Sequence, residues 1–366
     1  MTSRRVVAFG GGHGLSASLR ALRHCAPELD LDITAVVTVG DDGGSSGRLR
    51  AERGGLPPGD LRQALVALAG DHPATRRSAG LFQHRFAAVP TGVPQLGEAD
   101  PDPAATDGRD PGRGADGRDP GAAATGAHGH EPQTARVDGL AGHAVGNLVL
   151  CGLMELLGDP VAALDHAGAM LGAVGRVLPM SRQPVGIEAQ VRGIDPAAPD
   201  EVRTVRGQHQ VAVTTGRVES LRLTPAAPPA CAEVIEAIMA ADWLIFGPGS
   251  WYTSVLPHLL VPQVADAIVS TAARRLVTLN LAAEKETLGL SVADHLAALH
   301  WYLPELKVDL VLADAKAVGD PEPVERAAES LGARLVLAPV AVTGGTPRHD
   351  PAALGAALVP VLGADR

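Results

Sequence analysis

The stretch that decides the fold is RVVAFGGGHGLSASLRAL, which spans residues 5–22. Residues 5–9 form a short, mainly apolar run that is typical of a buried strand, and a cluster of glycines follows at residues 10–14. Leucines then recur over residues 15–22 at the spacing of an amphipathic helix. Such a strand–glycine–helix unit is typical of an open parallel sheet, and its loop presents backbone N–H groups that suit a phosphate.

The same alternation of strands and helices continues along the chain. Further short apolar runs lie at residues 33–39, 243–246, 276–279, 310–312 and 335–337, and helical patterns lie at 61–68, 144–157, 291–300 and 322–331. Near-continuous apolar strands that alternate with helices predict a parallel sheet covered on both faces. Residues 185–223 differ, because the pieces VGIEAQV, HQVAVTT and SLRL are β-like and separated by turns. We therefore predict a single α/β domain over residues 1–366, doubly wound and mostly parallel, with a small antiparallel excursion near 185–223.

One segment breaks this pattern. Residues 97–136 contain no Val, Leu, Ile, Met, Phe, Trp, Tyr or Cys, and they include the near-tandem copies DGRDPGRGA and DGRDPGAAA. Without any side chain larger than Ala to bury, the segment cannot offset the entropy lost on ordering. We predict a disordered, low-complexity insertion here. A recognition or phosphorylation segment at Thr106 or Thr125 is the functional alternative.

Composition excludes several classes of protein. The chain has 31 Lys and Arg against 41 Asp and Glu, so its formal charge is −10, which argues against a general binder of nucleic acid or anionic membranes. Cys25, Cys151 and Cys231 are far apart and form no CxxC pair, which argues against a disulfide framework or zinc site. No apolar run is long enough for a membrane span or, at the N-terminus, for a signal peptide. We expect a cytoplasmic protein.

Two glycine-rich loops follow apolar strands and precede predicted helices. The candidate ligand-binding residues in the first loop are Gly11, Gly12, His13 and Gly14, and in the second they are Gly247, Gly249, Ser250, Tyr252 and Thr253. The first loop is not a P-loop, and Leu15 occupies the place of the third glycine of a dinucleotide fingerprint. Tight strand–helix turns would explain each loop alone. Two such loops in one sheet predict a ligand with phosphates, such as a diphosphate.

An acidic loop follows the predicted strand at residues 33–39. Asp41 and Asp42 suit a ribose diol or a hard cation such as Mg²⁺, and Ser45, Ser46 and Arg48 suit an anion. A solvated acidic turn is the plain alternative.

Two further motifs carry candidate site residues. In PPGD, Asp60 either caps a helix or shares one cation with Asp42. His143 and Asn147 are four residues apart, so they would share a helix face and either bind a phosphate or base, or serve as caps and core contacts. The chain lacks GxSxG, HExxH and CxxC motifs and a Ser-His-Asp order, so hydrolase and metalloprotease classes have no support.

These motifs, taken together and in this order, resemble the gluconeogenesis-factor (YvcK) family within the CofD-like superfamily. The matching stretches are residues 10–22, 33–50, 56–69, 81–86, 142–148 and 247–261. The resemblance implies a Rossmann-like sheet, binding of UDP-N-acetylglucosamine, and a role in carbon metabolism and in cell-wall or cell-shape maintenance. It leaves open a homodimer.

The resemblance also extends to transferases that move a phospholactyl group from a guanylyl carrier to a deazaflavin. In that branch, acids placed like Asp42 and Asp60 hold a metal, which implies Mg²⁺ as the cofactor. The sequence departs from the family at His13, where Thr is usual, and at residues 280–287, which keep only Asn280, Glu286 and Thr287 of the usual motif. Asn280 joins the candidate ligand-binding set.

Three functions compete: a nucleotide-sugar-binding regulator, an Mg²⁺-dependent 2-phospho-L-lactate transferase, and a dinucleotide-dependent oxidoreductase. The start GGGHGLS favours the regulator over the transferase, whose members tend towards GGxGGA. An oxidoreductase is disfavoured because no acid–base pair for hydride transfer can be identified.

Overall fold

The computed structural model describes residues 3–88, 138–344 and 346–364. The chain divides into two compact units, one formed by Met1–Arg85 with His143–Arg366 and the other by Phe86–Gly142. The predicted insertion at residues 97–136 lies outside the described residues. All elements below belong to the first unit.

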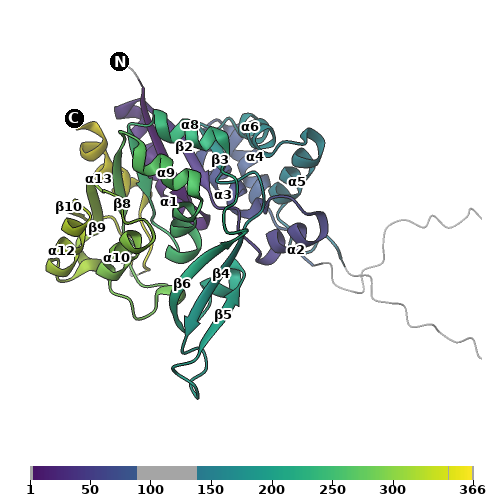
Figure 1. Ribbon diagram of the computed structural model, residues 1–366. Coiled ribbons are helices and arrows are strands. Elements are labelled where there is room, and N and C mark those ends of the chain that lie inside the picture. The colour runs from purple at the N-terminus through teal and green to yellow at the C-terminus, as the bar shows by residue number, and fades with distance from the viewer. Residues whose placement is uncertain (1–2, 89–137, 345, 365–366) are drawn as a thin grey trace, which may run out of the picture. The chain divides into compact units, whose positions relative to one another are not determined.

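A parallel sheet of seven strands forms the centre of this unit (Figure 1). Its order is β10-β9-β8-β7-β1-β2-β3, and every neighbouring pair is parallel. The strands are β1 (Arg4–Gly10), β2 (Leu31–Val37), β3 (Gly175–Pro179), β7 (Trp243–Phe246), β8 (Arg274–Thr278), β9 (Leu310–Asp314) and β10 (Arg334–Ala338). This confirms the predicted α/β class. Sequence reasoning missed β3, because only its last three residues are buried.

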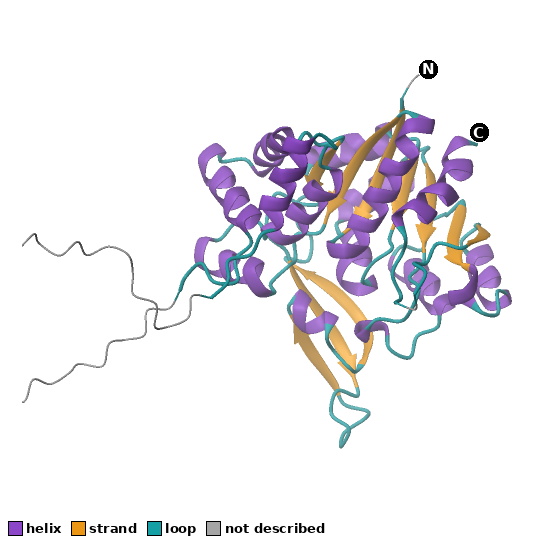
Figure 2. Cartoon of the chain, turned by 180° about the vertical axis from the view of Figure 1, so that it is seen from behind, coloured by secondary structure: helices purple, strands orange, loops and turns teal. Residues whose placement is uncertain are grey.

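The apolar strands are buried because helices cover them. Phe9 of β1 and Phe246 of β7 stack across the middle of the sheet, with ring centroids 4.9 Å apart. Chain order reverses at this pair: β1, β2 and β3 run in one direction across the sheet and β7 to β10 in the other. Because strand crossovers are right-handed, such a reversal places the helices of the two halves on opposite faces. Figures 1 and 2 show helices on both sides of the sheet.

Helices form at every predicted helical pattern, with bounds that are longer at some ends and shorter at others, and they also form at positions that were not predicted. They are α1 (Gly12–Leu29), α2 (Gly44–Arg53), α3 (Pro58–Leu68), α4 (Pro73–Gln83), α5 (Val145–Leu157), α6 (Pro160–Leu171), α8 (Ala232–Ala240), α9 (Pro262–Ser270), α10 (Val292–Tyr302), α11 (Ala315–Val318), α12 (Glu322–Ser330) and α13 (Pro351–Gly363). Short turns are η1 (Trp251–Val255), η2 (Leu256–Leu260) and η3 (Lys285–Thr287). Among the described residues, none of these helices combines the length and apolarity that a membrane crossing needs.

The predicted antiparallel excursion is present as a separate sheet of order β5-β4-β6. Its strands are β4 (Gly186–Arg192), β5 (Val202–Arg206) and β6 (Arg217–Thr224), and they project from the central sheet in Figure 2. The prediction of a β-like piece at HQVAVTT was wrong, because residues Gln208–Ala212 form the short helix α7. Asp42 explains the difference, since its carboxylate accepts the His209 backbone N–H at 2.8 Å and stabilises the helical turn.

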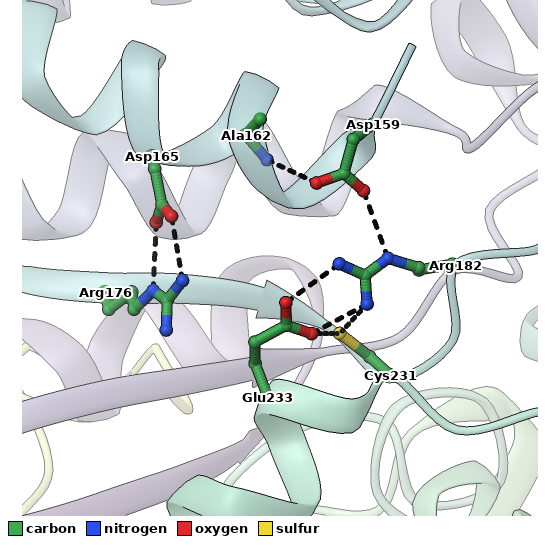
Figure 3. Close-up of polar contacts among 7 residues, drawn as sticks. All are labelled: Asp159, Ala162, Asp165, Arg176, Arg182, Cys231 and Glu233. Atoms are coloured by element: carbon green, nitrogen blue, oxygen red, sulfur yellow. Dashed lines mark hydrogen bonds and ion pairs between the residues drawn. The ribbon is translucent and has the colours of Figure 1, made fainter. Parts of the chain in front are cut away.

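An arginine clamp holds the β3 edge of the sheet to two helices (Figure 3). Arg182, just beyond β3, donates to the Asp159 carboxylate at 3.0 Å and to both oxygens of Glu233 at 2.7 and 2.8 Å. Asp159 also caps α6, and Glu233 lies in the first turn of α8. The same guanidinium therefore ties a strand end to two helix starts.

Candidate functional site

The two glycine-rich loops lie side by side at the carboxyl edge of the sheet, because β1 and β7 are neighbours. A Cβ atom added to Gly14 would lie 2.3 Å from the Pro248 carbonyl oxygen and 2.4 Å from the Gly249 Cα. Ser18 of α1 donates to the Gly247 carbonyl at 2.8 Å. Only glycine at position 14 allows this approach. The structure therefore brings the first and last predicted loops together at the point where strand order reverses, the usual ligand position in open α/β sheets.

Three helices start at this edge without a cap from the side chain of their own N-cap residue: α1 at Gly11, α2 at Gly43 and α5 at Ala144. Two of their first N–H groups have partners elsewhere, because Gly12 donates to the Asp60 carboxylate and Val145 donates to the His84 carbonyl. By contrast, Asp159 caps α6 and Asp350 caps α13. An uncapped helix start offers orphan N–H groups and the positive end of the dipole to an anion. The predicted residues Gly12, His13 and Gly14 form the first turn of α1, with the His13 side chain exposed.

A buried carboxylate lies directly beneath the first loop. Asp60 accepts a hydrogen bond from the Thr38 hydroxyl at 3.1 Å and is only 6% exposed. A Cβ on Gly11 would lie 2.6 Å from an Asp60 oxygen, so this glycine is also required by space. Burial, and then the neighbouring Asp41 carboxylate, raise the pKa of Asp60 to about 7. Burial likewise raises the pKa of Asp41.

The structure pairs Asp60 with Asp41, whereas the Asp42 carboxylate turns to α7. The alternative in which Asp60 caps its own helix is wrong, because α3 begins at Pro58 and Asp60 lies inside its first turn. Its carboxylate instead accepts the backbone N–H of Gly12 in the first turn of α1. The backbone passes close to the acids, because a Cβ on Gly59 would lie 2.5 Å from Asp41 Oδ2.

The residues around this pair fit a hard cation. Asp41 and Asp60 supply carboxylate oxygens, and the hydroxyls of Thr38 and Ser46 lie against them. Ser46 Oγ in turn accepts the Gly59 N–H at 2.6 Å. Within the described residues, no group of three or more His, Cys, Asp or Glu side chains is placed to bind a metal. Phosphate oxygens would therefore complete the shell of a cation held here.

A chain of buried polar side chains extends from the acidic loop. Ser45 Oγ lies 3.0 Å from His143 Nδ1 and accepts from the Asn147 amide at 2.9 Å. The Asn147 oxygen accepts from Arg62 Nε at 2.8 Å, and Arg62 also donates to Gln83. His143 lies two residues before α5, so it reaches Ser45 from the loop and not from the helix face that it was predicted to share with Asn147.

Burial shifts the pKa values of two basic side chains in this network, His143 and Arg62. Burial lowers the pKa of His143, and the nearby positive Arg48 side chain lowers it further. Burial also lowers the pKa of Arg62, while Asp60 and Asp41 act in the opposite direction. The buried Arg62 guanidinium therefore offsets part of the negative charge of the buried Asp60 and the half-buried Asp41.

The loop after β8 supports the second glycine-rich loop and places two carboxylates on it. The Asn280 amide donates to the Gly249 carbonyl and accepts from its N–H, both at 2.9 Å. Ser250 donates its hydroxyl to Glu284, just before η3. The Tyr252 N–H donates to Glu286 at 2.8 Å, and burial raises the pKa of Glu286 to about 7.

The second loop folds into η1 and is more buried than its composition indicates. Tyr252 and Thr253 are 6% and 1% exposed, and Trp251 is fully buried, with its ring edge-on to His295 at 5.3 Å. Among the candidate residues of this loop, Gly247 and Gly249 are buried as well, and Ser250 is partly exposed. The aromatic pair in this glycine-rich motif serves mainly to pack the loop.

Sequence reasoning missed several polar side chains of the site: Thr38, Gln83, Gln208 and Glu284. Gln208 belongs to α7, yet its side chain hydrogen-bonds Asp60 and its Oε1 lies 2.9 Å from the position that a Cβ on Gly40 would take. No local pattern marks such a residue, because the small sheet brings it to the acid pair from 148 positions away. Arg62 follows the PPGD motif by two residues, and its charge marks it in the sequence as a counter-ion for the acids.

Comparison with known proteins agrees with this geometry. Residues 6–336 match the family model of 2-phospho-L-lactate transferase CofD. The chain therefore belongs to the CofD family. Within that family, it is 32% identical over 333 residues to the gluconeogenesis factor of Bacillus subtilis, covering 91% of this chain and 84% of that protein.

Two further relatives cover nearly the whole chain. A Mycobacterium tuberculosis protein with the same provisional name is 45% identical to this chain over 364 residues. The alignment covers 98% of this chain and 91% of the Mycobacterium tuberculosis protein. A crystal structure of a UPF0052 family member from Bacillus halodurans superposes with a TM-score of 0.74 at 29% identity, covering 98% of this chain and 99% of its own. These matches confirm the resemblance to the gluconeogenesis-factor (YvcK) family.

Proposed function

We propose that this protein is a nucleotide-sugar-binding regulator that holds UDP-N-acetylglucosamine at the carboxyl edge of the central sheet. The observation that carries the proposal is the contact between the two glycine-rich loops at Gly14 and Gly249. This contact brings the first turn of α1 beside the turn that follows β7, although the N–H groups of Gly12, Gly249 and Tyr252 already have partners. The remaining N–H groups of the two turns would suit the two phosphates of a nucleoside diphosphate.

The flanking groups suit the rest of such a ligand. The start of α2 at Gly44, Ser45 and Ser46 offers further N–H groups to phosphate, and Arg48 adds a positive charge. Asp42 and the acid pair of Asp41 and Asp60 stand where hydroxyls of a ribose or a cation would be held. Asn280 acts indirectly in this scheme, since both ends of its amide position Gly249.

The names of the relatives support a cellular role. Because the Bacillus subtilis relative is named gluconeogenesis factor, we place this chain in the control of carbon metabolism. A sensor of a cell-wall precursor in the cytoplasm would also connect that control to cell-wall and cell-shape maintenance. In this role the protein binds its ligand without transforming it.

A second candidate function is an Mg²⁺-dependent transfer of a 2-phospho-L-lactyl group, which the matching family model carries in its description. The specific observation in its favour is the pair of the half-buried Asp41 and the buried Asp60, both with raised pKa values. Two such carboxyls would bind Mg²⁺, which would supply electrostatic stabilisation to a transferring phosphate. The chain's own residues would orient that phosphate through the starts of α1 and α2.

Calorimetric titration with UDP-N-acetylglucosamine, GDP and NAD, each with and without Mg²⁺, tests both functions. The regulator requires saturable binding of UDP-N-acetylglucosamine and no consumption of it. Gly249→Val should abolish this binding in a folded protein, because its φ of +145° disfavours any side chain. Gly80→Ala, an open position in α4, is the matched control. Binding of GDP alone, dependent on Mg²⁺, would instead support the transferase and contradict the regulator.

A further inference from the structure

Four polar side chains form a continuous hydrogen-bonded chain beside the first turn of α2. They come from separate segments: Arg62 from α3, Asn147 from α5, Ser45 from α2 and His143 from the loop before α5. None of the four is more than 5% exposed. Because buried donors and acceptors are nearly always paired, the positions of the protons in this chain can be worked out.

The Arg62 guanidinium determines the direction of the chain. Because a guanidinium only donates, the Asn147 side-chain oxygen accepts from Arg62 Nε, at 2.8 Å. The Asn147 amide nitrogen therefore faces Ser45 and donates to its Oγ at 2.9 Å. The start of α5 is packed closely enough to hold this orientation, since a Cβ on Gly146 would lie 2.9 Å from Arg62 Cδ and 2.8 Å from the Phe82 carbonyl oxygen.

The same logic assigns the proton of the Ser45 hydroxyl. Among the described residues, His143 Nδ1 is the only acceptor within hydrogen-bond distance of Ser45 Oγ, at 3.0 Å. If Nδ1 instead donated its own proton to Ser45, the hydroxyl proton would be buried without an acceptor, which is costly. Ser45 therefore donates to Nδ1, and the proton of the neutral ring lies on Nε2.

Burial and nearby charges keep the His143 ring neutral. Burial lowers its pKa, and the positive charges of Arg48 and Arg85 lower it further, while Glu52 acts in the opposite direction. The second ring nitrogen, Nε2, points away from Ser45 and has no hydrogen-bond partner among the residues that the structure describes. An N–H donor without a partner on so buried a side chain is open to an acceptor that a ligand brings.

The place of the ring indicates the kind of acceptor. Ser45, which His143 contacts, is the second residue of α2, and this helix starts without a cap from its own N-cap residue, Gly43. The N–H groups and the dipole of such a helix start favour an anion. A neutral N–H donor suits the same position, because it binds an anion without burying a further charge.

We propose that this chain fixes His143 in the Nε2–H tautomer, so that it donates a hydrogen bond to a phosphate oxygen bound at the first turn of α2. The inference rests on the proposed function for the identity of that phosphate as part of a nucleoside diphosphate. His143 then contacts the ligand, whereas Asn147 is a positioning residue that acts through Ser45.

Long-range proton–nitrogen NMR spectra of the ligand-free chain test the tautomer, because they distinguish a protonated from an unprotonated ring nitrogen. The signals lost in His143→Gln identify this ring among the 13 histidines. We expect a proton on Nε2 and none on Nδ1. His295 is an internal reference for the opposite tautomer, since its Nδ1 lies 2.8 Å from the Ser291 carbonyl oxygen, which can only accept.

Asn147→Asp should reverse the chain at nearly constant shape. A carboxylate only accepts, so it would take the Ser45 hydroxyl proton, and Ser45 would then accept from His143 Nδ1. The variant should therefore place a proton on Nδ1 of His143 and leave His295 unchanged. A proton that stays on Nε2 alone in this variant would overturn the positioning role. A proton on Nδ1 in the wild type would do the same, even if the variant does not fold.

Calorimetric titration with inorganic pyrophosphate tests the contact with phosphate. Pyrophosphate should shift the His143 Nε2 signal, and its binding should be about three- to tenfold weaker in His143→Ala. His143→Gln should retain most of the affinity, because its amide N–H reaches nearly the same place as Nε2. The matched control is His166→Ala, which removes an exposed histidine of α6 and should leave the affinity unchanged.

The outcomes separate this inference from the proposed function. An absence of pyrophosphate binding, equal affinities in His143→Ala and His166→Ala, or unchanged binding of UDP-N-acetylglucosamine in His143→Ala would each overturn the contact. Pyrophosphate carries the phosphates without the uridine or the sugar. A chain that binds pyrophosphate through His143 but fails to bind UDP-N-acetylglucosamine would therefore contradict only the proposed function.

Discussion

Gly14 shows how the absence of one side chain shapes the site. A methyl group there would meet the Pro248 carbonyl oxygen at 2.3 Å, which is backbone and cannot swing away. We expect Gly14→Ala to separate the two glycine-rich loops, destabilise the fold by about 1–3 kcal/mol, and abolish nucleotide-sugar binding. Chemical denaturation and calorimetry measure the two effects.

Gly152→Ala is the matched control for this substitution. Gly152 lies inside α5 with nothing within 4 Å of an added Cβ. The same chemical change should therefore stabilise the protein by about 0.5–1 kcal/mol, because alanine favours a helix interior. A Gly14→Ala protein with the stability and affinity of the wild type would contradict the close contact of the loops.

Asp60 should make stability depend on pH. Its pKa is about 7 in the folded chain against 3.8 for an ordinary aspartate, so the folded state retains a proton that the unfolded state has lost between these values. The group's favourable contribution to the free energy of unfolding is thus present below about pH 4 and lost as the pH rises through about 7. Asp60→Asn should flatten this dependence, as measured by chemical denaturation across that range.

Asp32→Asn provides the comparison for Asp60→Asn, because it removes an exposed carboxylate from β2. It should keep the wild-type dependence on pH. Added Mg²⁺ should stabilise the wild type most at the alkaline end of the range, where Asp41 and Asp60 are ionised, and should have no such effect on Asp60→Asn. A wild-type curve that is flat, or that rises with pH because of this residue, would contradict the raised pKa of the buried Asp60.

On the scale of elements, the loop after β8 takes up a hydrogen-bond donor that the proposed ligand would otherwise use. Its Glu284 carboxylate occupies the Ser250 hydroxyl, a group that would otherwise be free to donate to phosphate. Glu284→Gln removes the negative charge at nearly constant shape, so we expect about two- to fivefold tighter binding of UDP-N-acetylglucosamine. Glu322→Gln on α12 is the control. Weaker binding in Glu284→Gln would instead mean that this carboxylate contacts the ligand.

The arginine clamp at the β3 edge is a second feature on this scale. Arg182→Ala breaks hydrogen bonds to Asp159 and Glu233 that join β3 to α6 and α8, and should cost about 2 kcal/mol. Arg176→Ala, which breaks an ion pair to Asp165 that is nearly half exposed on each side, should cost well under about 1 kcal/mol. Both contacts are visible in Figure 3, and thermal denaturation compares them.

The arginine clamp should also make the stability of the fold depend on pH in the acid range. Its hydrogen bonds from Arg182 lower the pKa of Glu233 to about 2, from 4.5 for an ordinary glutamate. The stabilisation is therefore present above about pH 4.5 and lost as the pH falls through about 2. Arg182→Ala should remove this part of the acid sensitivity. Equal stability losses in Arg182→Ala and Arg176→Ala, with unchanged acid sensitivity, would contradict the clamp.

For the whole molecule, the prediction concerns residues 97–136. Because the segment has no side chain larger than Ala, apart from polar and charged ones and proline, it has little to contribute to a core. Replacing it with a short Gly/Ser linker should leave the melting temperature nearly unchanged. Leu61→Ala, in the core of α3, should by contrast cost about 2–5 kcal/mol. A comparable loss in the deletion variant would show that the segment packs against the fold.

The predicted architecture succeeded where the information is local. Apolar runs at residues 5–9 and 243–246 became β1 and β7, and the helical spacing of leucines at 15–22 became part of α1. Such patterns lie within a few consecutive residues, so they can be recognised without knowing the partners. Local patterns did not predict the strand β3, because only part of it is buried. They did not predict the helix α7 either, because a contact with the distant Asp42 stabilises it.

The sequence by itself determined which loops carry unusual chemistry, because glycines, paired acids and hydroxyls are marked by their own composition. Only the tertiary structure decided which of these groups meet. The order of the strands brings Gly14 against Gly249. In the folded chain, Asp41 is the acidic neighbour of Asp60, whereas Asp42 accepts a backbone N–H of α7. These contacts join residues that are far apart in the chain, and their pairing depends on strand order and solvent exclusion, which no local pattern contains.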